Sequence, residues 1–182
     1  MIKKWLKRIA WLAVAILVAI QFVPTSALKP LMEKNLEPVS VTNPPVDATQ
    51  ALNPPPAVLA VLQVSCYDCH SNETRWPWYA HVAPMSWMLI KHVTEGRHAM
   101  NFSTWSSYSP DKQADYLRNV DDAVTNGWMP LSSYLLIHRD AVLTPETAKL
   151  VGDWAHATAK QLDPAGTDDN DAPAKPTAPG GA

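Results

Sequence analysis

The sequence predicts a mostly α-helical fold, in which a small helical domain follows one N-terminal membrane-spanning helix. Segments with apolar residues at helical spacing open at proline or N-cap signals, and no segment alternates between apolar and polar residues as a half-buried strand does. A basic flank followed by an unbroken apolar run stands at the N-terminus. These observations favour a helical fold over one built on a sheet.

The first segment, residues 1–23, is predicted to be a membrane anchor. Its basic flank ends at Arg8, and its apolar run extends from Ile9 to Ile20. Because basic flanks stay in the cytoplasm, we expect a single pass through the inner membrane, with the rest of the chain facing the periplasm. A secretory signal cleaved after Ala27 is the alternative, which Pro24 disfavours.

The anchor is followed by residues 24–56, which are predicted to form a proline-rich tether. Asn43-Pro44-Pro45 and Asn53-Pro54-Pro55-Pro56 interrupt any helical periodicity, and this composition is typical of an extended linker. The alternative is a proline-rich strap that lies on the surface of the domain.

Residues 57–163 are predicted to form the helical domain, and residues 164–182, rich in Asp, Pro, Ala and Gly, a disordered tail. Ser109 and Thr144 each precede a proline and are expected N-caps, and Gly127 is an expected helix stop. The expected helices cover residues 57–65, 86–96, 110–126 and 145–163.

Cys66-Tyr67-Asp68-Cys69-His70 is the most specific motif in the chain. It matches C-x-x-C-H, the attachment signature of c-type haem, in which each cysteine forms a thioether to the porphyrin and the histidine binds the iron. Cys66, Cys69 and His70 are therefore predicted to hold one covalent haem c. Long irregular connections over residues 75–84 and 99–109 fit a domain whose core a haem completes.

Two cysteines at this spacing also occur in redox dithiols and in zinc sites. A thioredoxin-like dithiol would be set in a βαβ pattern, which the surrounding sequence lacks. A zinc site of this type would need a second cysteine pair, and both of the 2 cysteines in the chain already belong to the motif. Haem attachment is therefore the preferred interpretation.

Met129 is the predicted second axial ligand of the iron. It lies in Gly127-Trp128-Met129-Pro130, after one helix and before the last. A thioether ligand stabilises ferrous iron and raises the reduction potential, whereas plain core packing is the usual role of a methionine. The rival ligands are other methionines and the histidines outside the motif: Met85, Met88, Met100, His81, His92, His98, His138 and His156.

Arg75 and Trp76, shortly after the motif, are predicted to contact the haem. A guanidinium matches the carboxylate fork of a haem propionate, and an indole N–H can donate a hydrogen bond to it. Arg97 is a second candidate and Arg139 a weaker one. For each arginine, a solvated surface charge is the alternative.

The stretch from Ser65 to Tyr79 closely resembles the haem-binding domain family of bacterial membrane-anchored c-type cytochromes. The likeness continues through Ala83–Trp87, Glu95–Arg97, Asn101–Trp105 and Gly127–Leu131, then Tyr134, His138 and Ala141, so it covers roughly Val58 to Ala155. The resemblance implies one covalent haem in a periplasmic domain behind a membrane helix. The Met-Pro pair of the family falls on Met129-Pro130.

We therefore expect a membrane-anchored monohaem cytochrome that transfers single electrons at the periplasmic face and is not an enzyme. Its partners would be the haem, the membrane and a redox protein whose identity the sequence does not indicate. The net charge of −2 argues against nucleic acid as a partner. The alternatives are a haem-based redox or gas sensor and a peroxidase-like haem enzyme. Both require a sixth iron position that is open or easily vacated.

Overall fold

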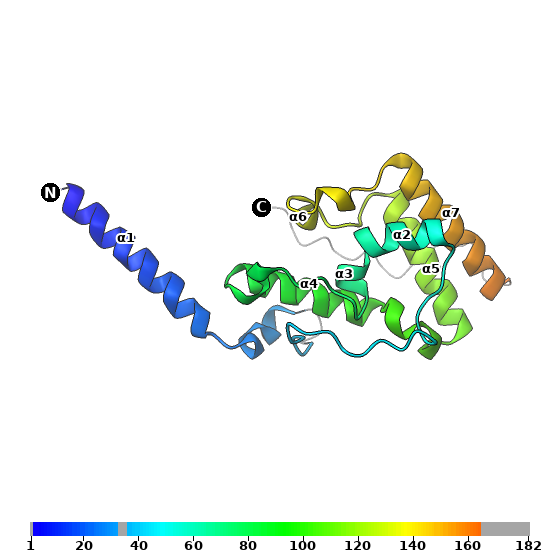
Figure 1. The fold of residues 1–182 in the computed structure, drawn as a ribbon, viewed down its shortest axis with the longest axis horizontal. Coiled ribbons are helices and arrows are strands. Elements are labelled where there is room, and N and C mark those ends of the chain that lie inside the picture. The colour runs from blue at the N-terminus through cyan, green and yellow to red at the C-terminus, as the bar shows by residue number, and fades with distance from the viewer. Residues whose placement is uncertain (1, 33–35, 165–182) are drawn as a thin grey trace.

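The computed structural model describes residues 2–32 and 36–164, and within these residues the chain is helical, with no strand. This confirms the predicted fold class. Figure 1 shows one helix, at the N-terminal end, projecting from a compact group formed by the other helices. The predicted tail lies outside the described residues from position 165 onward.

The projecting helix is α1, Ile2–Ala19, which continues into a 3-10 turn, η1, Ile20–Phe22. Within the described residues it is the helix that is long and apolar enough to span a membrane, over the 20 residues Lys3–Phe22. At about 1.5 Å per residue this stretch is about 30 Å long, which matches the hydrocarbon core of a bilayer. None of it is buried in the protein.

After a short 3-10 segment, η2, Thr25–Leu31, the chain crosses the surface of the domain. Residues 36–55, here called the strap, are irregular and are tied down by backbone and side-chain hydrogen bonds. These bonds are Val39 N to Thr94 Oγ1 (3.0 Å), Asn43 Nδ2 to Thr74 O (2.9 Å), Leu52 N to Phe102 O (2.9 Å) and Ser106 N to Gln50 O (3.0 Å). The described part of the proline-rich segment therefore follows the domain surface and is not a free tether.

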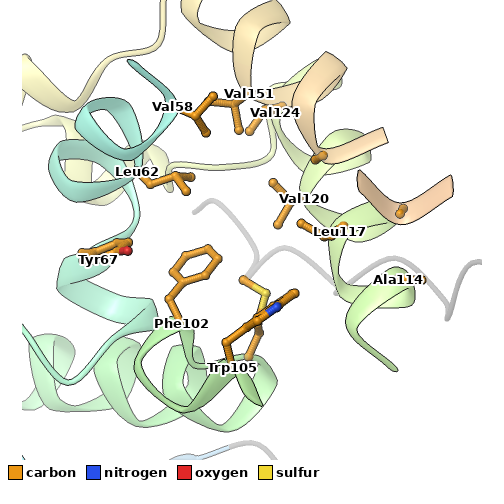
Figure 2. Close-up of a cluster of buried hydrophobic side chains, with 13 residues drawn as sticks. Val58, Leu62, Tyr67, Phe102, Trp105, Ala114, Leu117, Val120, Val124 and Val151 are labelled. Carbon is orange, nitrogen blue, oxygen red and sulfur yellow. The ribbon is translucent and has the colours of Figure 1, made fainter. Parts of the chain in front are cut away.

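The main core joins α2 (Pro56–Ser65), α5 (Pro110–Thr125), α7 (Pro145–Leu162) and a 3-10 segment, η5 (Phe102–Ser107). Figure 2 shows Leu62 and Phe102 pointing toward Leu117 and Val120 of α5. The fully enclosed side chains of this core include Leu62, Phe102, Leu117 and Val151. Burial of these apolar surfaces is the principal driving force for the packing of α2, α5 and α7.

The helix ends follow the predicted signals. Thr144 caps α7 with a reciprocal capping box to Thr147, and Gly127 follows α5 with φ +67°, a left-handed conformation that suits glycine. Ser109 occupies the N-cap position of α5, although its side chain makes no capping hydrogen bond.

The remaining elements surround the cysteine motif. They are α3 (Tyr67–His70), η4 (Trp78–His81), α4 (Met85–Ala99), α6 (Ser132–Leu135) and η6 (Arg139–Ala141). The α4 helix continues past Gly96, where the sequence suggested its end, so this glycine lies inside a helix. Its position there proves to be important for the site.

Candidate functional site

The cysteine motif forms a single tight turn, here called the attachment turn, Cys66–His70. Cys66 is the N-cap of α3, and its carbonyl oxygen accepts hydrogen bonds from Cys69 N (3.2 Å) and His70 N (3.0 Å). Both thiols are free and partly buried. The turn thus presents two thiols and one imidazole on one short piece of backbone.

The imidazole of His70 is oriented by the end of α4. Its Nδ1 lies 3.2 Å from the carbonyl oxygen of Met100, which can only accept a hydrogen bond, so Nδ1 carries the proton. Burial lowers the pKa of His70, which keeps the ring neutral. The Nε2 atom therefore retains its lone pair, and this arrangement is the usual one for a metal-binding histidine.

The two thiols of the attachment turn are held in their protonated form. Burial raises the pKa of Cys66 to about 12. Burial, together with the charge of Asp68, raises the pKa of Cys69 to about 12 as well. Redox-active C-x-x-C pairs lower a cysteine pKa to create a reactive thiolate, so this environment disfavours dithiol exchange chemistry.

The α4 helix approaches the attachment turn at Gly96. A Cβ atom at this position would lie 2.5 Å from the carbonyl oxygen of Cys69 and 2.9 Å from its carbonyl carbon. These are backbone atoms, which cannot rotate out of the way. The close contact between α3 and α4 therefore requires glycine at position 96.

Asp68, between the two cysteines, is a buried carboxylate with several partners. Its Oδ1 accepts hydrogen bonds from the backbone N (2.9 Å) and Nε (3.2 Å) of Arg75, and its Oδ2 accepts from Arg75 Nη2 (3.1 Å) and the hydroxyl of Tyr134 (2.7 Å). Because Tyr134 belongs to α6, Asp68 connects the attachment turn to the segment that follows Met129. Burial and the Asp68 carboxylate raise the pKa of Tyr134, so its phenol remains a donor.

Replacing Tyr134 with phenylalanine tests this connection. A buried hydrogen bond to a carboxylate contributes about 1.5–3 kcal/mol to stability, so we expect Tyr134→Phe to lower the unfolding temperature by several degrees. Tyr79→Phe is the matched control, because the Tyr79 hydroxyl lies 3.4 Å from His138 Nε2, a long contact that is only partly buried. Thermal unfolding followed by circular dichroism measures both. Equal losses in the two variants would contradict the special role of the Asp68 contact.

In the structure, the residues predicted to contact haem propionates form hydrogen bonds to other groups of the protein. Arg75 binds Asp68, although its side chain stays 56% exposed. Arg97 donates to the carbonyl oxygen of Ser71 (2.8 Å), and to Thr74 Oγ1 and Asn43 Oδ1 (2.9 Å each). The indole N–H of Trp76 donates to the same Asn43 oxygen, at 3.0 Å. Arg97 and Trp76 thus attach the strap to the chain that leaves the attachment turn.

Met129 lies half-buried in the connection between α5 and α6. Its backbone N–H donates to the carbonyl oxygen of Ala123 at 3.3 Å, which holds the connection to the end of α5. On its other side, Tyr134 holds α6 to Asp68 at the attachment turn. The segment that carries Met129 is therefore tied to two fixed points, one of which is the turn itself.

The sequence interpretation missed Asp68, Gly96 and Asn43 as residues that build the site. A signal existed for Gly96, because glycine inside a helical pattern costs about 1 kcal/mol relative to alanine and often marks a close backbone approach. Asp68 could have been noticed as an acidic residue inside a motif expected to be buried. Nothing in the local sequence indicates that Asn43 contacts residues so far along the chain.

The donor set fits a covalently attached haem. Two free thiols and a neutral imidazole with an available Nε2 occupy one turn, and no disulfide joins the cysteines. Within the described residues, no cluster of three or more His, Cys, Asp or Glu side chains forms a metal site. A family model described as a haem-binding domain matches residues 15–157. No curated protein and no solved structure matches the chain.

Proposed function

Since the chain belongs to the haem-binding domain family, with more than half of its length matched, we propose that it is a membrane-anchored monohaem cytochrome of the c type that carries single electrons. The geometry of His70 carries this proposal. A neutral imidazole whose Nδ1 is held by a carbonyl and whose Nε2 keeps its lone pair, beside two free thiols, is the donor set that c-type attachment uses. Binding of haem is the property that the family match supports directly.

When bound, the haem supplies an iron that alternates between two oxidation states. The chain provides the thiols of Cys66 and Cys69 for attachment and Nε2 of His70 for the iron. The carbonyl of Met100 holds the imidazole in one orientation and one tautomer, which increases the basicity of the free nitrogen. No residue is needed as a catalytic acid, base or nucleophile, and we propose that the protein is not an enzyme.

We further propose Met129 as the second axial ligand. Met100 is one of the rival methionines, but its carbonyl faces Nδ1 of His70, so its backbone lies on the side of the ring away from Nε2. The side chain of Met100 is buried in the main core with Tyr67 and Phe102. Met85 and Met88 belong to the first turn of α4, at the end of this helix opposite Met100. Met129 stands on a different segment, tied to the attachment turn through α6.

The membrane helix and its basic flank support a location in the inner membrane with the domain in the periplasm. The span Lys3–Phe22 has the length and apolar character required. The positively charged flank would stay in the cytoplasm. We propose that the segment is retained as an anchor, and fractionation should then leave the protein in the membrane after a carbonate wash.

Met129→Ala tests the electron-carrier function. The ferric wild type is expected to show the weak far-red band of a sulfur–iron bond, to titrate reversibly with one electron and to bind no carbon monoxide when reduced. Met129→Ala should lose the band, bind carbon monoxide and have a lower reduction potential, since a neutral thioether favours ferrous iron. Optical spectra and a potentiometric titration of the purified full-length protein measure these properties.

Met88→Leu and Met100→Leu are the controls, and both should keep the band. Retention of the band in Met129→Ala would assign the ligand to another methionine. A wild type that lacks the band and binds carbon monoxide at once would favour a gas sensor instead. Turnover of peroxide by the wild type would favour a peroxidase-like enzyme.

A further inference from the structure

We propose that one corner of the domain rests directly on the bilayer that α1 spans. This corner, here called the η4 corner, is defined by the side chains of Trp78, Val82 and Met85. The inference rests on the proposed function only in taking α1 as a membrane-spanning helix. It adds a lipid-binding surface, the η4 corner, and a fixed position of the domain on the membrane. This contact between the η4 corner and the bilayer is here called the seat.

The first observation is a direct contact between the end of the anchor and this corner. The side chain of Gln21, in the last turn of the apolar span, donates from Nε2 to the carbonyl oxygen of Ala83 at 3.1 Å. It also accepts from the backbone N of Ala83 at 3.0 Å. Because Gln21 marks the boundary of the span, Ala83 lies at the same boundary, between Val82 and the start of α4.

A second contact keeps the domain in this place. Leu28 and Met32, which follow the span, are each only 5% exposed and form a small core with Ile90 of α4. The six Cα–Cα steps from Phe22 to Leu28 reach at most about 20–22 Å when fully extended, and η2 shortens this reach. Figure 1 shows α1 leading through η2 to the side of the domain formed by α4. The domain therefore cannot move far from the membrane surface.

The η4 corner has the side chains that suit this position. Trp78 is 78% exposed, Val82 42% and Met85 38%. In the segment of the same chain that follows α1, Phe22 is 81% exposed and Leu31 is 66% exposed. Tryptophan is enriched at the lipid–water interface, where its apolar ring and its polar N–H are both accommodated. Burial of these groups in the interfacial region removes apolar surface from water.

The charge of the segment agrees with a lipid surface. Residues 76–91, which include the whole η4 corner, contain no Asp or Glu. Anionic lipid headgroups repel acidic side chains and attract basic ones. The occupant that this combination favours is a bilayer surface containing anionic lipid, at the depth that Gln21 defines.

Photolabelling of the full-length holoprotein tests the seat. The protein is reconstituted in vesicles of phosphatidylcholine and phosphatidylglycerol that carry a diazirine lipid reactive near the headgroup. After illumination and trypsin digestion, the peptide Trp76–Lys91 should carry several-fold more label than the peptide Leu150–Lys160. The second peptide is a matched reference, because Leu150 on α7 is 39% exposed, close to the 38% of Met85.

Variants at exposed positions distinguish loss of the membrane contact from a defect in folding. Trp78→Gln combined with Val82→Thr should reduce the label on Trp76–Lys91 to the reference level, with the haem spectrum unchanged. Leu150→Gln should change neither. Trp78, Val82 and Leu150 are all exposed, and substitutions on the surface usually alter stability little.

The possible failures are distinguishable. Label on the anchor peptide without excess label on Trp76–Lys91 would overturn the seat and leave the anchor intact. An unlabelled anchor peptide, with extraction of the protein by carbonate, would overturn the proposed anchor itself. Crosslinks from Trp76–Lys91 to another protein in native membranes, with no lipid label in pure vesicles, would also overturn the lipid seat and point to a protein contact.

Discussion

Simultaneous replacement of Cys66 and Cys69 with alanine is expected to leave almost no holoprotein. Each thiol offers one thioether, so the double variant has no covalent link to the porphyrin, and acidic organic solvent would extract any haem held only by the axial ligands. The double variant would also lack the haem, which the long irregular connections over residues 75–84 and 99–109 are expected to surround. Haem content per protein, measured after acidic organic extraction, should fall from one to near zero.

The single variants Cys66→Ala and Cys69→Ala serve as controls, because each keeps one thioether. We expect both to retain some covalent haem, with an absorbance maximum shifted by the unreacted vinyl group. The intact mass of the wild type should equal the chain plus one haem. If acidic organic solvent extracts the haem from the wild type, attachment is not covalent and the c-type assignment fails.

Gly96→Ala is expected to have the second-largest effect, although alanine is the better helix former by about 1 kcal/mol. The new Cβ would lie 2.5 Å from the carbonyl oxygen of Cys69, so α3 and α4 must move apart. Overpacking of this kind costs about 1–3 kcal/mol. Because the displaced backbone belongs to the attachment turn, the yield of holoprotein should fall together with the unfolding temperature.

Gly152→Ala is the matched control within the same domain. Gly152 is also buried in a helix, but its new Cβ would meet Oδ1 of Asp121 at 2.7 Å, the end of a side chain that is 28% exposed and can rotate. We expect this variant to be neutral or slightly stabilised, with normal haem content. Thermal unfolding and haem content of the two variants, compared side by side, measure the effect. Equal behaviour would contradict the requirement for glycine at the contact with α3.

The cysteine–histidine motif, the helix that is apolar and long enough to span a membrane, and most helix boundaries could be predicted from the sequence, because each depends on residues that are close together in the chain. Thr144 and Gly127 act through neighbours within one turn, so their types were enough to place the helix ends. The family match confirms the resemblance that rests on the stretch around Cys66. The span of α1 depends only on the length and composition of one segment.

The arrangement around His70 required the tertiary structure, because it joins residues from distant parts of the chain. The carbonyl that orients its ring comes from the end of α4, and the strap reaches Arg97 through Asn43. The choice between a tether and a strap depended on hydrogen bonds of this kind, which composition does not encode.

By itself, the sequence determined which groups are available to bind a haem and which segment can enter a membrane, since these properties follow from residue type and local spacing. Only the tertiary structure decided how those groups are held. Asp68 is buried because Arg75 and Tyr134 converge on it from different segments. The domain lies close to the end of α1 because Gln21 meets Ala83. Both contacts depend on how the helices pack, and packing is a property of the whole chain.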